Sequence, residues 1–210
     1  LRYQAYIFNG FLSHDEVEGK LKGSNGLRSG RQKGAQSTFD QLNYSAKLDY
    51  YGIPALRLGL STYAGRTQAV GDAPKLGTVV GVRMLGADLR YSQKKWSARG
   101  QWIYAQLTDT EAYNVQTGRD LGSALHGYYT EVAYNLLPLS ARQRWVTFVR
   151  YENYNTHHQV AGSLSPNPDF HRKEWTVGWS YHLSQGSVFK MDYQKKNELS
   201  QFNIGLGVWF

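Results

Sequence analysis

The sequence predicts an all-β fold, a transmembrane antiparallel up-and-down β-barrel with about ten strands in this chain of 210 residues. Three observations lead to this prediction. Apolar and polar residues alternate with a period of two, which is typical of strands with one apolar face. No stretch approaches the roughly 18 apolar residues that a membrane helix needs. Short turns alternate with long polar connections, as in membrane barrels.

The composition agrees with a barrel wall that meets lipid on one side and water on the other. The chain has 16 Tyr, 6 Trp and 22 Gly, and its mean hydropathy is −0.55. A polar average does not argue against a barrel, because lipid-facing and lumen-facing residues alternate along each strand. Aromatic residues gather near predicted strand ends, as in Tyr91 with Trp96 and Tyr134 with Trp145. Such clusters are expected at the two membrane interfaces.

The alternation is cleanest in residues 42–51, which predict a strand with one apolar and one polar face. The apolar positions are Leu42, Tyr44, Ala46, Leu48 and Tyr50, and the polar positions are Asn43, Ser45, Lys47 and Asp49. A turn is expected at residues 52–54, where Pro54 needs no hydrogen-bond donor. The pattern returns at Leu56, Leu58 and Leu60. Residues 1–9 form a less regular first strand, because Tyr6 and Phe8 share a face with Arg2 and Gln4.

Similar alternation predicts the remaining strands. They centre on residues 87–92, 96–104, 128–136, 145–154, 175–183, 189–193 and 202–208. No amphipathic helix is expected between them. The whole chain, residues 1–210, is therefore predicted to be one β-barrel domain.

The connections alternate in length. Short turns are expected at 52–55, 92–95, 137–143 and 184–187, and long polar connections at 10–40, 66–77, 108–126 and 155–172. Outer-membrane barrels have short periplasmic turns and long external loops. The C-terminus is therefore predicted to lie on the periplasmic side.

The last residues resemble the C-terminal signature of bacterial outer-membrane barrels, which ends in an aromatic residue after alternating apolar positions. These are Phe202, Ile204, Leu206, Val208 and Phe210. The resemblance implies that the barrel-insertion machinery reads this segment. We therefore expect the outer membrane of a Gram-negative bacterium as the location and outer-membrane lipid as a partner.

Several short segments, in order across nearly the whole chain, resemble the C-terminal half of the phosphate-selective porin O and P family. They are residues 9–10, 30–34, 52–56, 148–154, 192–194 and 202–207, which read NG, GRQKG, GIPAL, FVRYENY, DYQ and FNIGLG. The resemblance implies a trimeric porin of about sixteen strands that passes phosphate or other small anions. Because about ten strands are predicted here, an N-terminal part of the barrel is expected to lie outside this sequence.

The alternation also assigns charged residues to the predicted lumen. The cations are Lys47, Arg57, Arg90, Arg99, Arg150 and Lys190, and the acids are Asp49, Asp88, Glu131, Glu152 and Asp192. In a wide lumen, guanidinium groups pass anions by replacing part of their hydration. In a narrow lumen the cations and the acids are expected to form ion pairs that hold neighbouring strands of the wall together. The second reading gives a structural or accessory subunit of a larger outer-membrane complex.

The connection at 10–40 is longer than a turn requires and is rich in cations. Its candidate constriction residues are Lys20, Lys22, Arg28, Arg31 and Lys33. It either folds into the lumen and narrows it, or remains outside and contacts a neighbouring protomer or surface sugars.

An enzyme is the less favoured alternative. Asp169 and His171 lie near His157 and His158, and a carboxylate–histidine pair of this kind resembles the sites of omptin-like surface barrel hydrolases. Asp109 and Glu111 are the candidates for the second acidic pair that such a site needs. No catalytic residue, metal or cofactor is predicted. The cations are dispersed, so no nucleic-acid partner is expected.

Overall fold

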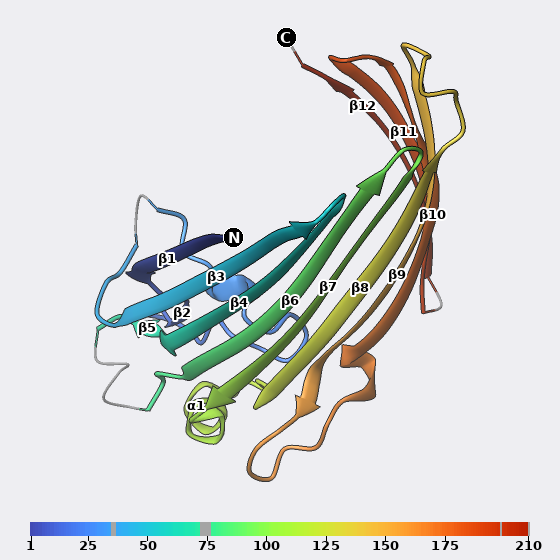
Figure 1. Cartoon of the computed structure of the whole chain (residues 1–210). Coiled ribbons are helices and arrows are strands. Elements are labelled where there is room, and N and C mark those ends of the chain that lie inside the picture. Colours follow the sequence, from blue (N-terminus) through green and yellow to red (C-terminus); the bar gives the residue numbers. More distant parts are fainter. Residues whose placement is uncertain (35–36, 72–76, 198, 210) are drawn as a thin grey trace.

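The computed structural model describes residues 1–34, 37–71, 77–197 and 199–209, and one antiparallel sheet dominates it (Figure 1). Within the described residues this sheet has ten strands. They are β1 (Arg2–Asn9), β3 (Leu42–Ile53), β4 (Leu56–Arg66), β6 (Gly81–Gln93), β7 (Trp96–Thr108), β8 (Ala124–Asn135), β9 (Arg144–Gln159), β10 (His171–Ser184), β11 (Ser187–Lys196) and β12 (Leu199–Val208). Each pairs with the next of these strands along the chain, so the predicted all-β, up-and-down arrangement of ten strands is confirmed.

Within the described residues, neither edge of the sheet is closed by a further strand. Among the described residues, β1 pairs only with β3, and β12 pairs only with β11. Figure 1 shows a curved sheet with these two strands at its ends. A separate pair of short parallel strands, β2 (Leu12–His14) and β5 (Gln68–Ala69), lies in the connections.

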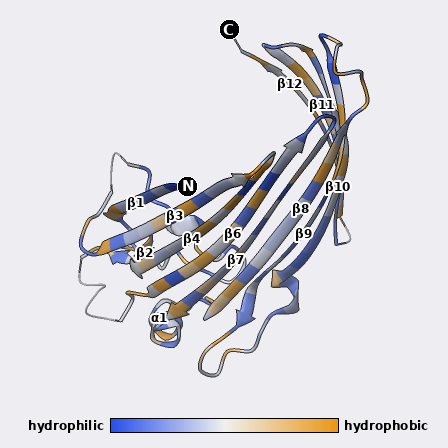
Figure 2. Cartoon of the chain, viewed as in Figure 1, coloured by the Kyte–Doolittle hydropathy of each residue, from blue (hydrophilic) through white to orange (hydrophobic). Residues whose placement is uncertain are grey.

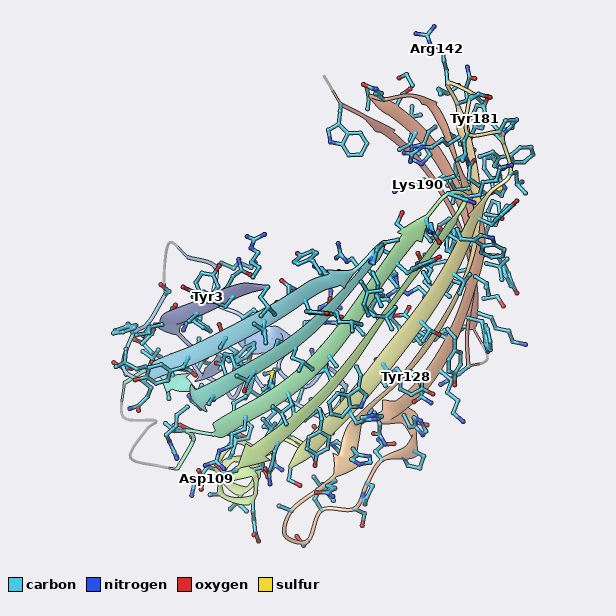
Figure 3. The ribbon with its side chains drawn as sticks, viewed as in Figure 1. Tyr3, Asp109, Tyr128, Arg142, Tyr181 and Lys190 are labelled. Atoms are coloured by element: carbon cyan, nitrogen blue, oxygen red, sulfur yellow. The ribbon has the colours of Figure 1, made fainter. Side chains whose placement is uncertain are left out.

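The ends of the strands agree with the predicted connections. The turns at 54–55, 94–95, 136–143 and 185–186 lie at one end of the sheet, which we call the short-turn end. The N–H of Trp209 donates to the carbonyl of Gly186 (2.6 Å), so the end of β12 lies beside a short turn. The opposite end, with the long connections, is the loop end. In Figure 3, Asp109 marks the loop end and Arg142 the short-turn end.

The sequence predicted no amphipathic helix between the strands, but a short helix that is not amphipathic is present. Helix α1 (Thr110–Thr117) lies in the connection between β7 and β8. Its sequence has no continuous apolar stripe, so hydrophobic periodicity could not reveal it. Tertiary packing stabilises the helix instead, because the Tyr113 side chain is fully buried. No helix in the described part of the chain is long and apolar enough to cross a membrane.

The sheet has an inner face and an outer face, defined by what packs on them. Residues 11–34, here called the packed segment, lie against one face at its loop end, and we call this the inner face. Leu21 and Leu27 of the packed segment belong to one buried cluster with Val82 of β6 and Leu107 of β7. Helix α1 joins this cluster through Tyr113, whose hydroxyl accepts from the N–H of Leu21 (2.9 Å).

The outer face carries exposed apolar side chains over most strands. Leu60 is 64% exposed and Val177 is 56% exposed. Other exposed apolar residues on this face include Leu48, Leu58, Leu85, Val132, Trp175, Ile204 and Leu206. Figure 2 shows hydrophobic and hydrophilic residues alternating along the strands. A continuous apolar surface of this kind marks a site of contact with lipid or with another protein.

The packed segment is held mainly by burial of its apolar side chains, which gives a direct test. Leu21→Ala is expected to destabilise its packing by about 2–5 kcal/mol, because it empties a fully buried position. Trypsin should then cut after Arg28 and Arg31 faster than in the parent protein. Val17→Ala is the control, because Val17 is 86% exposed. Equal cleavage of the Leu21→Ala variant and the parent would contradict this packing.

Candidate pore-lining face

All six cations predicted to line a lumen lie on the inner face. Their most ordered feature is a row across neighbouring strands, in which Arg57 pairs in register with Arg90, and Arg90 with Arg99. The row continues through Glu131 to Arg150. The period-two pattern of the sequence predicted that these arginines share one face. The strand register places them in one row across five strands.

A compact ion-pair cluster joins β3 to β4 and β6, the first two strands of the row. Lys47 Nζ lies 2.8 Å from Asp88 Oδ2 and 3.6 Å from Asp49 Oδ1. The Arg57 guanidinium pairs with Asp88 through Nη2, and its Nε lies 3.8 Å from Asp49 Oδ1. Two cations therefore neutralise two acids, and Asp49 is nearly inaccessible to solvent. The cluster links β3, β4 and β6 on the inner face, and a role in bracing a barrel wall stays a prediction.

Further along the row, two more arginines are paired. Arg99 Nη2 lies 2.8 Å from Glu131 Oε2, and Arg150 Nη2 lies 2.7 Å from Glu152 Oε1. The guanidinium of Arg150 also lies over the ring of Tyr129, 4.3 Å from its centroid. These contacts fix both side chains and leave little free positive charge on them.

Arg90 and Lys190 differ from the other four cations. Both are exposed, and neither makes an ion pair with any residue that the structure describes. Arg90 lies between two arginines whose charges are already paired. The inner face therefore combines four paired cations with two that have no ion-pair partner among the described residues.

One polar cluster on this face was not predicted from the sequence. Lys196 Nζ lies 2.9 Å from Glu174 Oε1, and the same carboxylate accepts from Tyr154 Oη (2.8 Å) and Gln194 Nε2 (2.7 Å). The predicted strands stopped at residues 154, 175 and 193, short of most of this cluster. Extending the period-two pattern by a few residues would have placed these side chains on the polar face.

The candidate constriction cations of the packed segment differ in whether they form ion pairs. Lys20 pairs with Asp15 and with Glu18, the latter at 3.2 Å. Arg28 and Arg31 line a hollow together with Ile103 of β7 and Tyr154 of β9. Lys22 and Lys33, like these two arginines, form no ion pair with a described residue. The segment folds over the inner face, while its effect on passage of solutes stays a prediction.

Asp15 supplies a pH-dependent contact in this segment. Its carboxylate accepts a hydrogen bond from Lys20, and this bond is the main cause that lowers the pKa of Asp15 to about 2. Its Oδ1 also accepts from the N–H groups of Val17 (2.9 Å) and Glu18 (2.7 Å). A lowered folded-state pKa gives a stabilisation that is fully present above the unfolded value near 4. It is lost as the pH falls through about 2.

The amide NMR shifts of Val17 and Glu18 should therefore show a transition near pH 2. Asp15→Asn is expected to abolish that transition, because the amide side chain does not ionise. Glu16→Gln is the control and should leave it unchanged. A transition that persists in Asp15→Asn would assign the titration to another group.

Four residues of the predicted insertion signature lie on the outer face of β12. Phe202, Ile204, Leu206 and Val208 are all exposed, whereas Phe210 lies outside the described residues. Each of these four residues of β12 pairs in register with a residue of β11, such as Ile204 with Met191. Recognition of this segment by an insertion machinery stays a prediction.

The candidate hydrolase residues form no assembled site among the described contacts. His171 Nε2 bonds to Asn153 Oδ1 (2.9 Å), and Asp109 pairs with Arg66 (3.0 Å). His157 is buried, and its Nδ1 accepts from the N–H of Asn167 (3.2 Å). Within the described residues, no three acidic, histidine or cysteine side chains form a group that could hold a metal.

Comparison with known proteins gives one informative relative. A protein of Aquifex aeolicus, described only as uncharacterized, is 27% identical over 207 residues. The match covers 94% of this chain and 46% of that protein, so the chain spans about half the length of its relative. No protein-family model matches the chain, and no solved structure matches it.

Proposed function

We propose that this chain forms part of an outer-membrane β-barrel porin through which small anions diffuse passively. The observation that carries the proposal is the contrast between the two faces. Every acidic residue in the ten strands of the described sheet lies on the inner face: Asp49, Asp88, Glu131, Glu152, Glu174 and Asp192. The outer face exposes leucine, valine and aromatic residues. A bilayer on one side and water on the other explains both distributions.

The proposed barrel is wider than ten strands. The edge strands β1 and β12 leave hydrogen-bonding groups unpaired within the described sheet, and such groups cannot remain open in a bilayer. The Aquifex relative is about twice as long as the chain that it matches. Further strands that join both edges would satisfy the backbone and enclose a lumen wide enough for water. About sixteen strands and a homotrimer, as in the porins that the sequence resembles, are part of this proposal.

The charge on the inner face favours anions. Most of its acids are paired with arginine or lysine, whereas Arg90, Lys190, Arg28 and Arg31 have no such partner among the described residues. Free cations at the wall and over the lumen raise the local concentration of anions. Their exposure also keeps binding weak enough for release, as conduction requires.

Planar-bilayer recording tests the proposal. The purified full-length protein should give stepwise conductance, and in a potassium chloride gradient the reversal potential should indicate that chloride is the more permeant ion. A preference for potassium would reject anion selectivity. Insertion without conductance would reject the porin.

A second candidate function is a structural or accessory barrel subunit. It is favoured by the ion-pair cluster of Lys47, Arg57, Asp49 and Asp88, and by the packed segment over the inner face. Both features fill space and brace the wall. This candidate predicts a protein that inserts into bilayers, remains non-conducting and co-purifies with an outer-membrane partner.

A further inference from the structure

The outward-facing charges of the sheet have one sign and one location. In the described strands, the only charged side chains on the outer face are Arg66, Arg83, Lys173 and Lys195, and all are cations. All four lie within three residues of the loop end of their strands. Arg66 is paired with Asp109 (3.0 Å), whereas Arg83, Lys173 and Lys195 are exposed and unpaired among the described residues.

Three histidines complete this edge. Register places His126 and His171 on the outer face near the loop end. The His158 ring joins them, because it lies 5.6 Å from the ring of His126 and 6.2 Å from that of Tyr104. We call Arg83, His126, His158, His171, Lys173 and Lys195 the cationic rim.

An aromatic layer lies directly beside the rim on its short-turn side. Trp102 Nε1 donates to His126 Nε2 (2.8 Å), and the rings of Tyr151 and Trp175 lie 4.6 Å apart. Lys173 precedes Trp175 by two residues on the same face, and Lys195 is the register partner of Trp175. Aromatic side chains of this kind lie at the level of lipid headgroups, so the adjacent rim reaches the headgroup phosphates.

The short-turn end has no such rim on its strands. Its cations Lys94, Lys95 and Arg142 lie in the turns, whereas Arg2 and Arg144, at the short-turn ends of β1 and β9, lie on the inner face. A bilayer by itself accounts for the lack of charge in the middle of the outer face, but a neutral or zwitterionic surface gives no reason for cations rather than acids to occupy the outward positions near the loop end. An anionic surface gives that reason, because each nearby cation is attracted and each acid is repelled.

We propose that the cationic rim binds the phosphate groups of anionic lipids in the leaflet beside the long loops. Lysine and arginine recognise phosphate through charge and hydrogen bonds, and the unoccupied ring nitrogens of the histidines can add hydrogen bonds. The inference rests on the membrane location in the proposed function. It does not require conduction.

The test compares two triple variants of the full-length protein in detergent micelles. One neutralises the rim (Arg83→Gln, Lys173→Gln, Lys195→Gln), and the other neutralises the turns (Lys94→Gln, Lys95→Gln, Arg142→Gln). Phosphatidic acid and phosphatidylcholine are titrated separately, and native mass spectrometry measures the lipid that remains bound. Circular dichroism checks that both variants retain their strands.

The parent protein and the turn variant should retain phosphatidic acid in preference to phosphatidylcholine. The rim variant should bind phosphatidic acid on the order of 100-fold more weakly, from roughly a fivefold loss for each neutralised cation. Equal binding by the rim variant and the parent overturns the inference, as does an equal loss in both variants. The lipid-binding assay does not depend on conductance. A protein that conducts but shows no rim-dependent lipid binding would therefore reject the lipid-binding proposal and leave the porin proposal intact. A protein that binds lipid through the rim but does not conduct would reject the porin proposal and leave the lipid-binding proposal intact.

Discussion

Leu60→Arg is expected to destabilise the protein in lipid vesicles by about 2–4 kcal/mol, the cost of an arginine at the lipid-facing middle of a membrane strand. Leu60 is 64% exposed and lies in the middle of β4 on the outer face. In water, a substitution at so exposed a position changes the free energy of unfolding by no more than about 0.5 kcal/mol. The same variant therefore separates a lipid-facing from a water-facing surface. Urea unfolding in phosphatidylcholine vesicles measures the difference.

The control places the same side chain on the other face. Gln101 is exposed on the inner face of β7, in register with Asp88. Gln101→Arg should leave the free energy of unfolding nearly unchanged, because its side chain remains exposed to water on the inner face. If Leu60→Arg and Gln101→Arg had equal small effects, the outer face would not contact lipid.

Arg90→Glu is expected to reduce the anion preference roughly 30-fold, because it changes the charge by two units and each unit charge about 4 Å from an ion is worth about 1 kcal/mol in water. Arg90 is the exposed, unpaired member of the arginine row. The substitution changes the charge at this point by two units, while Arg57 and Arg99 keep their acidic partners. Reversal potentials in a potassium chloride gradient report the permeability ratio.

Lys94→Glu is the matched control, since it makes the same charge change in the turn between β6 and β7. It should leave the permeability ratio unchanged. An equal shift in both variants would mean that selectivity follows net charge. No shift in Arg90→Glu would mean that Arg90 lies away from the path of the ions.

The sheet was predictable because its signal is local. A period of two survives in each strand separately, and the short turns fix which strands are neighbours. The same reasoning assigned Arg57, Arg90, Arg99 and Arg150 to one face without any knowledge of register. It could not say which of them are free, since ion pairing depends on side chains from other strands.

The packed segment was not predictable for the opposite reason. Its position depends on contacts between residues far apart in the chain, such as the hydrogen bond from Leu21 to Tyr113, 92 residues away. Both readings of the segment, inward and external, fitted its polar, cation-rich sequence. Helix α1 was missed because a short helix without an apolar stripe has no periodic signal.

The most direct test asks whether the inner face of the sheet contacts water and the outer face contacts lipid. It uses the absence of cysteine from the chain. Thr176 and Val177 are neighbours in β10 that lie on the inner and the outer face respectively. Thr176→Cys and Val177→Cys are inserted separately into vesicles and treated with a charged, membrane-impermeant thiol reagent. A water-filled lumen predicts rapid labelling at 176 and protection at 177. Equal labelling at both positions, or labelling at 177 alone, would contradict a wall with lipid on one side and water on the other.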